Sequence, residues 1–441
     1  MAKKTKDSNL SIEERLEQAL IPNWDEPYKL PPNWCWVNLQ SVLQHQSGNS
    51  KLIKGKLESE KKEGLYDAYS ASGQDVYTAS YEHEGDAIIV SAVGARCGKA
   101  FLAKGKWSAI ANTHIIYTND KLIDIRYLYY VLNDEFWWVK RGNAQPFIVV
   151  NESLSKPFAL PPLKEQLRIV SRIESLFAKL DEAKKRAQEV IDGFETRKAA
   201  ILHKAFSGEL TVKWREENHC SLNEWINCSI DELCFSLKYG TSKKSKSEGS
   251  VVVIRMGNLQ QGEIDWHNLA FTDDVGDIEK YRLYPGDVLF NRTNSAVLVG
   301  KTSIYRGEYP AIFAGYLIKL DYDHNNIVGD YLNYALNTTA AKEYCNSVKT
   351  DGVNQSNINA KKIGAFVIPV APKSEQEEIV RIINRSLSKE KATKSAAKSV
   401  IEQIDTTKKA ILARAFHGEL GTNDPSEESA MELLRTILES K

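Results

Sequence analysis

The sequence lacks the features that would anchor it in a membrane or build a metal site. Its 441 residues include six cysteines, which form neither a Cys-x-x-Cys pair nor a metal-binding spacing with histidine. No stretch approaches the roughly 18 apolar residues of a membrane span, and the start, MAKKTKDSNL, lacks the apolar core of a signal peptide. We therefore expect a reduced, metal-free, cytoplasmic protein without a membrane partner.

Net charge is also absent, because 58 Lys and Arg balance 58 Asp and Glu. Any basic surface for nucleic acid must therefore be local. The chain is otherwise ordinary in composition, with 42% hydrophobic and 26% charged residues. Its length suggests two or three globular domains.

Motifs of common catalytic sites are missing as well. VLVGKTS (297–303) contains GKT, but Ser295 stands where a P-loop needs its first glycine. The glycine-rich loop and the (Asn/Asp/Ser)-Pro-Pro-aromatic motif of an adenine or cytosine methyltransferase are absent, as are GxSxG, HxxxH and a plausible Cys/His pair. These absences argue against a methyltransferase or nuclease, so we predict no catalytic residue, metal ligand or cofactor on this chain.

The sequence does contain one long internal repeat. Residues 162–210 and 372–420 align without a gap at an offset of 210, with 21 of 49 positions identical. Residue frequencies alone would give roughly three matches. A repeat of this period indicates a duplicated domain.

Each copy predicts a long helix. Apolar residues of the first copy recur at alternating steps of four and three, a heptad seam, over a helix of roughly 65 Å from about Leu163 to Phe206. Gly193 interrupts this helix at a cost of ~1 kcal/mol. The predicted seam is Ile169, Ile173, Leu176, Leu180, Ala183, Ala187, Val190 and Phe194, then Ile379, Ile383, Leu387, Ala397, Val400, Ile404 and Ile411.

The seam of the second copy is weaker, because Ser386, Glu390 and Thr393 replace apolar residues of the first. It needs a partner, most simply the first helix in a coiled coil. The alternative is that each helix only caps its own domain.

Two mixed α/β regions precede the two helices. AIIVSAV (87–93) and AIANTHIIYT (109–118) are the best predicted strands of the first, and VVVIRM (251–256) is one of those in the second. The duplication extends into these regions, since YLYYVLN (127–133) matches YLNYALN (331–337) at five of seven positions. Between such anchors the loops differ, as expected if each domain presents its own binding surface.

Polar loops recur at matching places in both regions. Arg, Asn and Gln make the paired hydrogen bonds that distinguish guanine from adenine edges, and lysines bind phosphates. Any one of these residues could be an ordinary turn residue, whereas their recurrence favours DNA binding. The candidates are Ser70, Ser72, Gln74, Ser91, Arg96, Lys99, Thr113, His114, Asn143 and Gln145, then Lys243, Lys244, Lys246, Arg255, Asn258, Asn291, Arg292, Asn294, Ser295, Lys301, Asn354 and Gln355.

The chain closely resembles the specificity subunit of type I restriction–modification systems. EQ-x-x-IV…K-x-AIL-x-x-AF-x-GEL occurs at 165–210 and 375–420, after domains that open near WCWVNL and close with FALPP or FVIPV. The resemblance covers nearly the whole chain. It implies a pseudo-two-fold tandem repeat of α/β target-recognition domains, separated by two long antiparallel coiled-coil helices.

The resemblance also implies partners. Each domain would read one half of a bipartite, asymmetric site in double-stranded DNA, with half-sites about one turn (~34 Å) apart. Two modification subunits, which hold the adenine methyltransferase site and S-adenosylmethionine, would dock on the helices. Restriction subunits would add a translocase and nuclease that use ATP and magnesium. The alternative is a coiled-coil scaffold that binds only proteins.

The expected organisation has seven parts. They are an N-terminal helical extension (1–23), a first recognition domain (24–160), a first spacer helix (161–210), a polar linker (211–222), a second recognition domain (223–370), a second spacer helix (371–420) and a helical tail (421–441).

Overall fold

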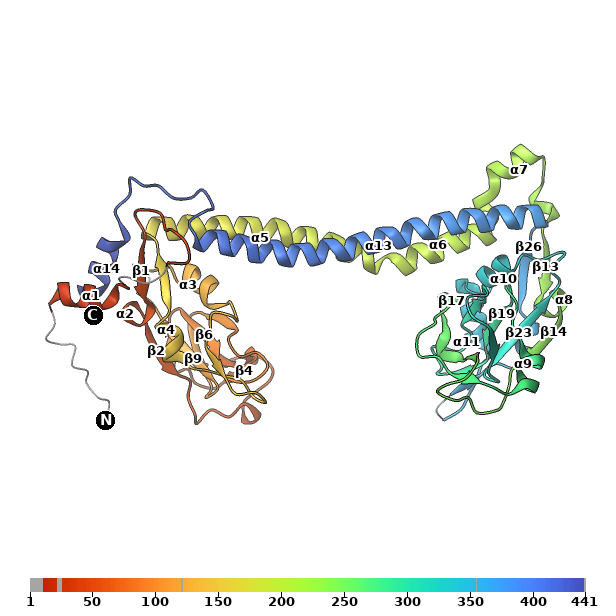
Figure 1. The fold of residues 1–441 in the computed structure, drawn as a ribbon, viewed down its shortest axis with the longest axis horizontal. Coiled ribbons are helices and arrows are strands. Elements are labelled where there is room, and N and C mark those ends of the chain that lie inside the picture. Colours follow the sequence, from red (N-terminus) through yellow and green to blue (C-terminus); the bar gives the residue numbers. More distant parts are fainter. Residues whose placement is uncertain (1–10, 22–25, 120–121, 354, 440–441) are drawn as a thin grey trace. The chain divides into compact units, whose positions relative to one another are not determined.

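The computed structural model describes residues 11–21, 26–119, 122–353 and 355–439. The chain divides into two compact units, Met1–Arg186 with Val400–Lys441 and Ala187–Ser399. Each unit joins one mixed α/β domain to parts of the long helices (Figure 1). The predicted polar start, the first domain boundary at 23/24 and Asn354 lie outside the described residues.

The first domain contains two four-stranded sheets, with strand orders β2-β9-β6-β7 and β4-β3-β8-β5. All five residues of β6 are buried, and β6 confirms the strand predicted at 87–93. The strand predicted at 109–118 is confirmed only in its second half, as β9, because Ala109 ends β8 and a turn separates the two. The strands are β2 (Gln44–Ser47), β3 (Tyr66–Ser70), β4 (Gly73–Thr78), β5 (His83–Glu84), β6 (Ala87–Ser91), β7 (Ala100–Ala103), β8 (Lys106–Ala109) and β9 (Thr113–Tyr117).

A two-stranded ribbon closes this domain. Strand β1 (Cys35–Asn38) pairs antiparallel with β12 (Pro157–Leu160), so the beginning and the end of the domain lie side by side. Four short elements complete the domain: α2 (Leu39–Val42), β10 (Lys140–Arg141), β11 (Phe147–Ile148) and α4 (Val150–Leu154).

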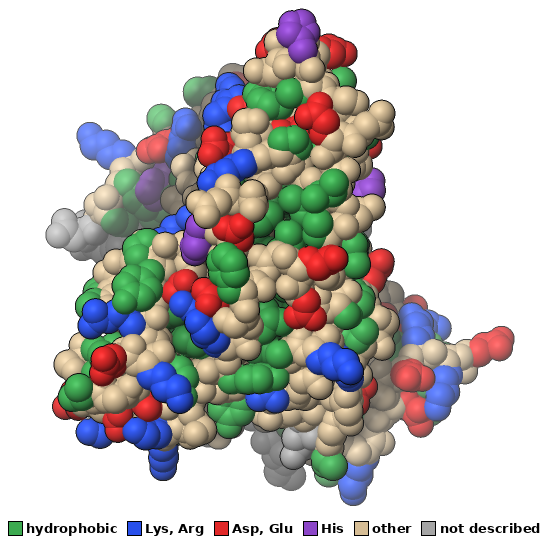
Figure 2. Space-filling view, turned by 90° about the vertical axis from the view of Figure 1, so that its right-hand side faces the viewer, with side chains coloured by type: hydrophobic (Ala, Val, Ile, Leu, Met, Phe, Trp, Pro, Cys, Tyr) green, Lys and Arg blue, Asp and Glu red, His purple; other side chains and the backbone are tan. Residues whose placement is uncertain are grey.

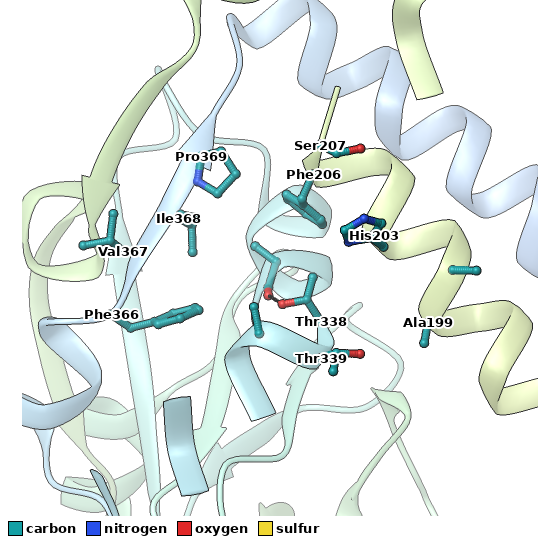
Figure 3. Close-up of a pocket in the computed structure, with 13 residues that line it drawn as sticks. Ala199, His203, Phe206, Ser207, Thr338, Thr339, Phe366, Val367, Ile368 and Pro369 are labelled. Atoms are coloured by element: carbon teal, nitrogen blue, oxygen red, sulfur yellow. Dashed lines mark hydrogen bonds between the residues drawn. The ribbon is translucent and has the colours of Figure 1, made fainter. Parts of the chain in front are cut away.

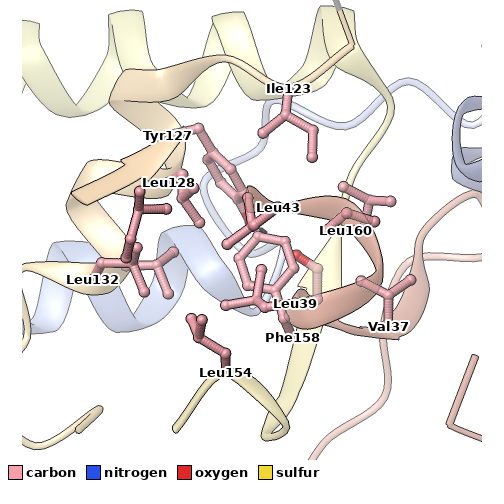
Figure 4. Close-up of a cluster of buried hydrophobic side chains, with 14 of the residues drawn as sticks. Val37, Leu39, Leu43, Ile123, Tyr127, Leu128, Leu132, Leu154, Phe158 and Leu160 are labelled. Carbon is pink, nitrogen blue, oxygen red and sulfur yellow. Dashed lines mark hydrogen bonds between the residues drawn. The ribbon is translucent and has the colours of Figure 1, made fainter. Parts of the chain in front are cut away.

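Helix α3 (Ile125–Leu132) supplies much of the core of the first unit. Asp124 caps it by accepting hydrogen bonds from two backbone amides of the first turn. Its residues Tyr127, Leu128 and Leu132 lie on one face and meet Leu39 and Phe158 in one buried cluster (Figure 4). Ile169 and Ile173 of the first spacer helix belong to the same cluster, which fixes the start of that helix on the domain.

The second domain repeats this plan with different sheets. Its six-stranded sheet has the order β14-β23-β19-β21-β17-β16, and two three-stranded sheets have the orders β18-β15-β22 and β20-β25-β24. The strands are β14 (Cys234–Tyr239), β15 (Val251–Ile254), β16 (Leu259–Gln260), β17 (Gly262–Ile264), β18 (Phe271–Thr272), β19 (Val288–Asn291), β20 (Thr293–Asn294), β21 (Thr302–Ile304), β22 (Ala311–Phe313), β23 (Leu317–Tyr322), β24 (Thr350–Asp351) and β25 (Ser356–Asn357).

The closing ribbon also recurs, as β13 (Ile226–Ser229) paired with β26 (Val367–Val370). Its register places Ile226 opposite Val370, as Cys35 lies opposite Leu160 in the first domain. The helices of this domain are α8 (Ile230–Leu233), α9 (Val275–Tyr281), α10 (Gly329–Ala335), α11 (Thr339–Val348) and α12 (Ala360–Gly364).

The long helices are α5 (Leu163–Asp192) with α6 (Phe194–Phe206), and α13 (Lys373–Phe416). Gly193 separates α5 from α6, yet backbone hydrogen bonds on both sides of it continue the helical ladder. Ion pairs join the helices in opposite chain directions. Lys184 pairs with Asp405 and Asp181 with Lys408 in the first unit, and Arg197 pairs with Glu390 in the second.

Most residues predicted for the seam are buried or half-buried, with two differences. Val400 is 41% exposed, and the neighbouring Ile401 is half-buried in its place. A step of four from Ala397 reaches Ile401, and a step of three from there reaches the buried Ile404, so the apolar stripe passes through Ile401. Ala183 of the first copy is also exposed.

The repeated Glu-Gln pair at the start of each spacer helix is fully buried. Gln166 accepts a hydrogen bond from the amide of Asp124 (3.0 Å), and Gln376 accepts one from the amide of Val328 (2.9 Å). Each glutamine also donates to a backbone carbonyl five residues earlier, that of Pro161 or Ala371. The two side chains therefore fix each helix to its own domain.

The paired glutamates bind the chain that follows the opposite Gly-Glu-Leu. Glu375 accepts hydrogen bonds from Thr211 and Arg215 (both 2.6 Å) and from Trp225 (2.8 Å). Glu165 accepts one from Thr422 (2.7 Å), in the same arrangement. The predicted polar linker is thus not a simple tether, because Thr211 and helix α7 (Val212–Asn218) are held against α13.

The predicted terminal helices are confirmed as α1 (Ile12–Ala19) and α14 (Ala430–Glu439). Ser11 and Glu14 form a capping box at the start of α1. Leu16 of α1 and Leu434 of α14 belong to the core cluster of the first unit. Among the described residues, no helix is long and apolar enough to cross a membrane.

Candidate nucleic-acid interface

Both domains build the same loop from different side chains. In the first domain, the amide of Gly98 donates to the carbonyl of Ser91, and the amide of Ser91 donates to the carbonyl of Lys99 (both 2.9 Å). In the second, Gly300, Asn291 and Lys301 make the two equivalent bonds (both 2.8 Å). Gly98 and Gly300 have φ of 94° and 91°, a left-handed conformation that favours glycine.

A second segment lies beside this loop in each domain. The amide of Ile148 donates to the carbonyl of Ala92 (3.0 Å), and the amide of Ile358 donates to the carbonyl of Arg292 (2.8 Å). The backbone frame is therefore repeated, whereas Ala92 of one frame corresponds to Arg292 of the other. A shared frame with unlike side chains suits two surfaces that bind different sequences.

Arg292 is a cation without a carboxylate partner in the described part of the chain. Its guanidinium lies 4.8 Å from the ring centre of Tyr239 and donates two long hydrogen bonds, to the carbonyl of Gly315 (3.3 Å) and to Asn357 (3.4 Å). Its Nε is buried and has no hydrogen-bond partner among the described residues. A guanidinium that is held against an aromatic ring and is not paired with a carboxylate can bind a phosphate or a guanine edge.

A hollow of about 390 Å³ in the second unit gathers further candidates. Arg255, Gln260, Asn294 and Lys301 line it, and Lys301 donates to Gln260 (3.0 Å). The guanidinium of Arg255 donates to the carbonyl of Asn268 (2.6 Å), which leaves its other donors available. The residues that line this hollow present both hydrogen-bond donors and acceptors, which recognition of base edges requires.

Two of the three lysines predicted to bind phosphates are neutralised by carboxylates. Lys243 pairs with Asp274 and Asp277, and Lys246 with Asp273. A lysine held by carboxylates must break those pairs before it can release counterions from DNA. Lys244 is exposed and shows no such pair among the described residues, so its charge remains available to a ligand.

In the first domain the exposed candidates are Ser72, Gln74, Arg96, Lys99, Asn143 and Gln145. Arg96 donates to the carbonyl of Ser72 (2.7 Å), and the amide of Gly94 donates to the carbonyl of Pro146 (2.9 Å). These contacts bring the loops of Ser72, Arg96 and Gln145 together at one edge of the domain. In the second domain, Ser295 and Gln355 are likewise exposed.

Five of the predicted DNA contacts are buried, which corrects the sequence prediction. Their side chains shape or pack beneath the loops; Asn258, for example, donates to the carbonyls of Asp265 (2.9 Å) and His267 (3.2 Å). Short polar residues beside strands look alike in sequence whether they face solvent or hold a turn. The five are Ser70, Ser91, Thr113, Asn258 and Asn291.

His114 is also turned inward. It lies on β9, and its Nδ1 is buried without a hydrogen-bond partner among the described residues. Burial, aided by the nearby His45, lowers the pKa of His114 from 6.5 to about 4. The ring is therefore neutral at physiological pH and does not add positive charge to the interface.

Two aromatic residues beside the candidate interface, Tyr239 and Tyr316, were not predicted from the sequence. Tyr239 supports the Arg292 guanidinium and accepts a hydrogen bond from the amide of Ala360 (2.9 Å). Tyr316, whose carbonyl accepts a hydrogen bond from the amide of Arg292 (3.0 Å), is half exposed. The available signal was the position of Tyr239, which lies within the lysine-rich stretch 238–246.

Charge on the surface is mixed rather than of one sign. Figure 2 shows a face on which Lys and Arg side chains are interspersed with Asp and Glu. This agrees with a net charge of zero. Any contact with DNA must therefore rest on local groups such as Arg292.

Another hollow of the second unit is apolar. It measures about 570 Å³ and lies between α6, the start of α11 and β26, where His203, Phe206, Phe366 and Ile368 line it (Figure 3). Its apolar walls do not suit nucleic acid. Among the described residues, no group of acidic, histidine or cysteine side chains could hold a metal ion.

The chain contains two copies of one α/β domain, and each copy has polar loops at one edge. This arrangement is that of a tandem binding protein. The family model described as "Type I restriction modification DNA specificity domain" matches residues 31–191 and 223–403. The chain belongs to this family and carries its domain twice. The family is one of DNA specificity, which agrees with the prediction of a non-catalytic chain.

Named relatives support the same assignment. The type I restriction enzyme EcoKI specificity subunit of Escherichia coli (strain K12) is 26% identical over 268 residues, 59% of this chain and 57% of that protein. The StySPI specificity subunit of Salmonella potsdam is 25% identical over 68% of this chain and 66% of its own length. The EcoDI specificity subunit of Escherichia coli is 22% identical over 89% of this chain and 90% of its own length.

Solved structures share the fold. The HsdS subunit from Thermoanaerobacter tengcongensis superposes with a TM-score of 0.58 and 19% identity, over 89% of this chain and 99% of that one. A chain from a structure on assembly and conformational transition of the type I R-M system gives a TM-score of 0.67 and 18% identity, over 89% and 100%.

Proposed function

We propose that this chain is the DNA-recognition subunit of a type I restriction–modification complex, in which each α/β domain reads one half of a bipartite, asymmetric site. One observation carries the proposal. The two domains share the hydrogen-bonded frame around Gly98 and Gly300 but place Ala92 and Arg292 at equivalent positions. A common frame with different side chains gives two different sequence specificities.

We further propose that α5, α6 and α13 form an antiparallel coiled coil whose length sets the gap between the half-sites. The ion pairs Lys184–Asp405 and Arg197–Glu390, one in each unit, support this pairing. The buried residues of the predicted seam support it as well.

The partners we propose are double-stranded DNA, two modification subunits docked on the helices, and restriction subunits. S-adenosylmethionine, ATP and magnesium belong to those partners. The family assignment and the internal repeat support this composition, because a two-fold repeat offers two equivalent docking places.

Selection from a random DNA library tests the proposal, with the chain co-expressed with its modification subunit. We expect enrichment of two short fixed blocks separated by a constant random gap. Enrichment of no sequence by an intact complex would contradict DNA recognition and favour the protein-binding scaffold.

A further inference from the structure

Two valines in the second domain are almost fully exposed. Val297 is 90% exposed and Val353 is 100% exposed. A single exposed apolar residue is common on protein surfaces. Two at one edge of a candidate interface require an explanation, because the polar residues Asn294, Ser295 and Gln355 stand only two or three positions away in the chain.

The sheet topology places both valines at the same edge. Strands β20 and β24 both pair antiparallel with β25, which lies between them. They therefore run in the same direction, and the chain leaves both at the same end of the sheet, with strand ends roughly 10 Å apart. Val297 and Val353 follow these strand ends within three residues, and Lys349 bridges the two segments by donating to the carbonyl of Ala296 (3.0 Å).

The surroundings of this edge indicate nucleic acid. In the described part of the chain, Arg292, between β19 and β20, has no carboxylate partner, and Lys301 donates to the neutral amide of Gln260 and has no carboxylate partner either. Cations without anionic partners attract phosphates. A narrow β-ribbon such as β24–β25 also has the dimensions that enter a major groove, which is ~12 Å wide.

We propose that Val297 and Val353 read thymine by packing on C5-methyl groups in the major groove. This inference rests on the proposed function and names a means by which the second domain selects bases. The thymine methyl is the apolar group that a major groove presents, and cytosine lacks it. An aliphatic side chain packed on it removes both groups from water without needing a hydrogen bond.

The test uses the full chain with its modification subunit and the DNA target found by selection. Each thymine in the half-site that depends on residues 223–370 is replaced singly by deoxyuridine, which lacks only the methyl group. We expect at least one replacement to weaken binding by the wild type roughly fourfold, the worth of one buried methyl group. In Val297→Ala or Val353→Ala that sensitivity disappears, and affinity for the thymine target falls to the deoxyuridine level.

Val212→Ala is the matched control, since Val212 is an exposed valine on α7 (43%) and should keep the wild-type response. The inference is overturned if the double variant Val297→Ala/Val353→Ala retains the methyl dependence, if the wild type shows none, or if this half-site has no thymine on either strand. Equal binding of target and scrambled duplexes by the wild type would instead overturn the proposed function itself.

Discussion

The most informative single residue is Arg292. Its guanidinium is held by Tyr239 and two long hydrogen bonds rather than by a carboxylate. Among the residues that the structure describes, no carboxylate neutralises this positioned charge. Lys243 and Lys246, which look equally basic in the sequence, are already paired with aspartates.

We predict that Arg292→Ala weakens specific binding by ~1–3 kcal/mol and relaxes base preference in one half-site. Lys244→Ala should instead weaken binding to all sequences alike and reduce the slope of affinity against salt by about one. Fluorescence anisotropy at several salt concentrations measures both effects. If Arg292→Ala lowered the melting temperature and left base preference intact, Arg292 would be structural.

His114 provides a prediction about pH. Its pKa is about 4 in the folded protein and 6.5 when exposed, so between these values the unfolded chain binds a proton that the folded chain does not. Stability should therefore be unaffected by His114 above pH 6.5 and should fall as pH drops from 6.5 toward 4, by at most ~1.4 kcal/mol per pH unit.

His114→Gln removes this titration, so unfolding of the two proteins should be compared across that pH range. The difference in unfolding free energy between wild type and variant should change most between pH 6.5 and 4. A difference that is constant with pH would show that folding does not lower the pKa of His114.

At the scale of elements, the start of each spacer helix is the best-determined junction. The Glu-Gln pair supplies both connections, since the glutamine binds the helix to its own domain and the glutamate binds the segment after the other Gly-Glu-Leu. The repeated Glu-Gln pair therefore has a structural role in both halves of the chain. It ties each domain to both long helices.

We predict that Glu375→Ala destabilises the second unit by about 3–5 kcal/mol, because it leaves the buried Arg215 without its carboxylate. Denaturant unfolding followed by tryptophan fluorescence measures this, and Trp225 next to Glu375 is a local reporter. Glu378→Ala is the control, since its partner Arg381 is exposed and can be hydrated once the pair is lost, so the change should matter far less. Similar losses in the two variants would contradict the role assigned to Glu375.

At the scale of the whole molecule, the duplication makes each domain a separate module. The ribbon β13–β26 brings the ends of the second domain together, as β1–β12 does for the first. A segment whose ends are adjacent can be exchanged without disturbing its surroundings.

We therefore predict that replacing residues 223–370 with the same segment of another family member changes only one half of the DNA target. Library selection with the chimeric complex measures this. The other half-site and the gap should remain as in the wild type, which serves as the internal control. An unchanged target would show that this domain does not read DNA.

The sequence by itself determined the duplication, the long helices and the mixed α/β class. Each depends on local pattern, because heptad steps and short apolar runs are recognised from residues close together in the chain. It also indicated the family, because the Glu-Gln and Gly-Glu-Leu motifs recur intact.

Tertiary structure alone decided which polar residues are available to a ligand. Asn258 and Asn291 are buried while Arg255 and Arg292 retain free donors, and the aspartates that neutralise Lys243 lie about 30 residues away along the chain. Such differences depend on long-range contacts that no local pattern encodes. The passage of the apolar stripe through Ile401 rather than Val400 was likewise decided by packing, since both residues suit a helix and only one faces the core.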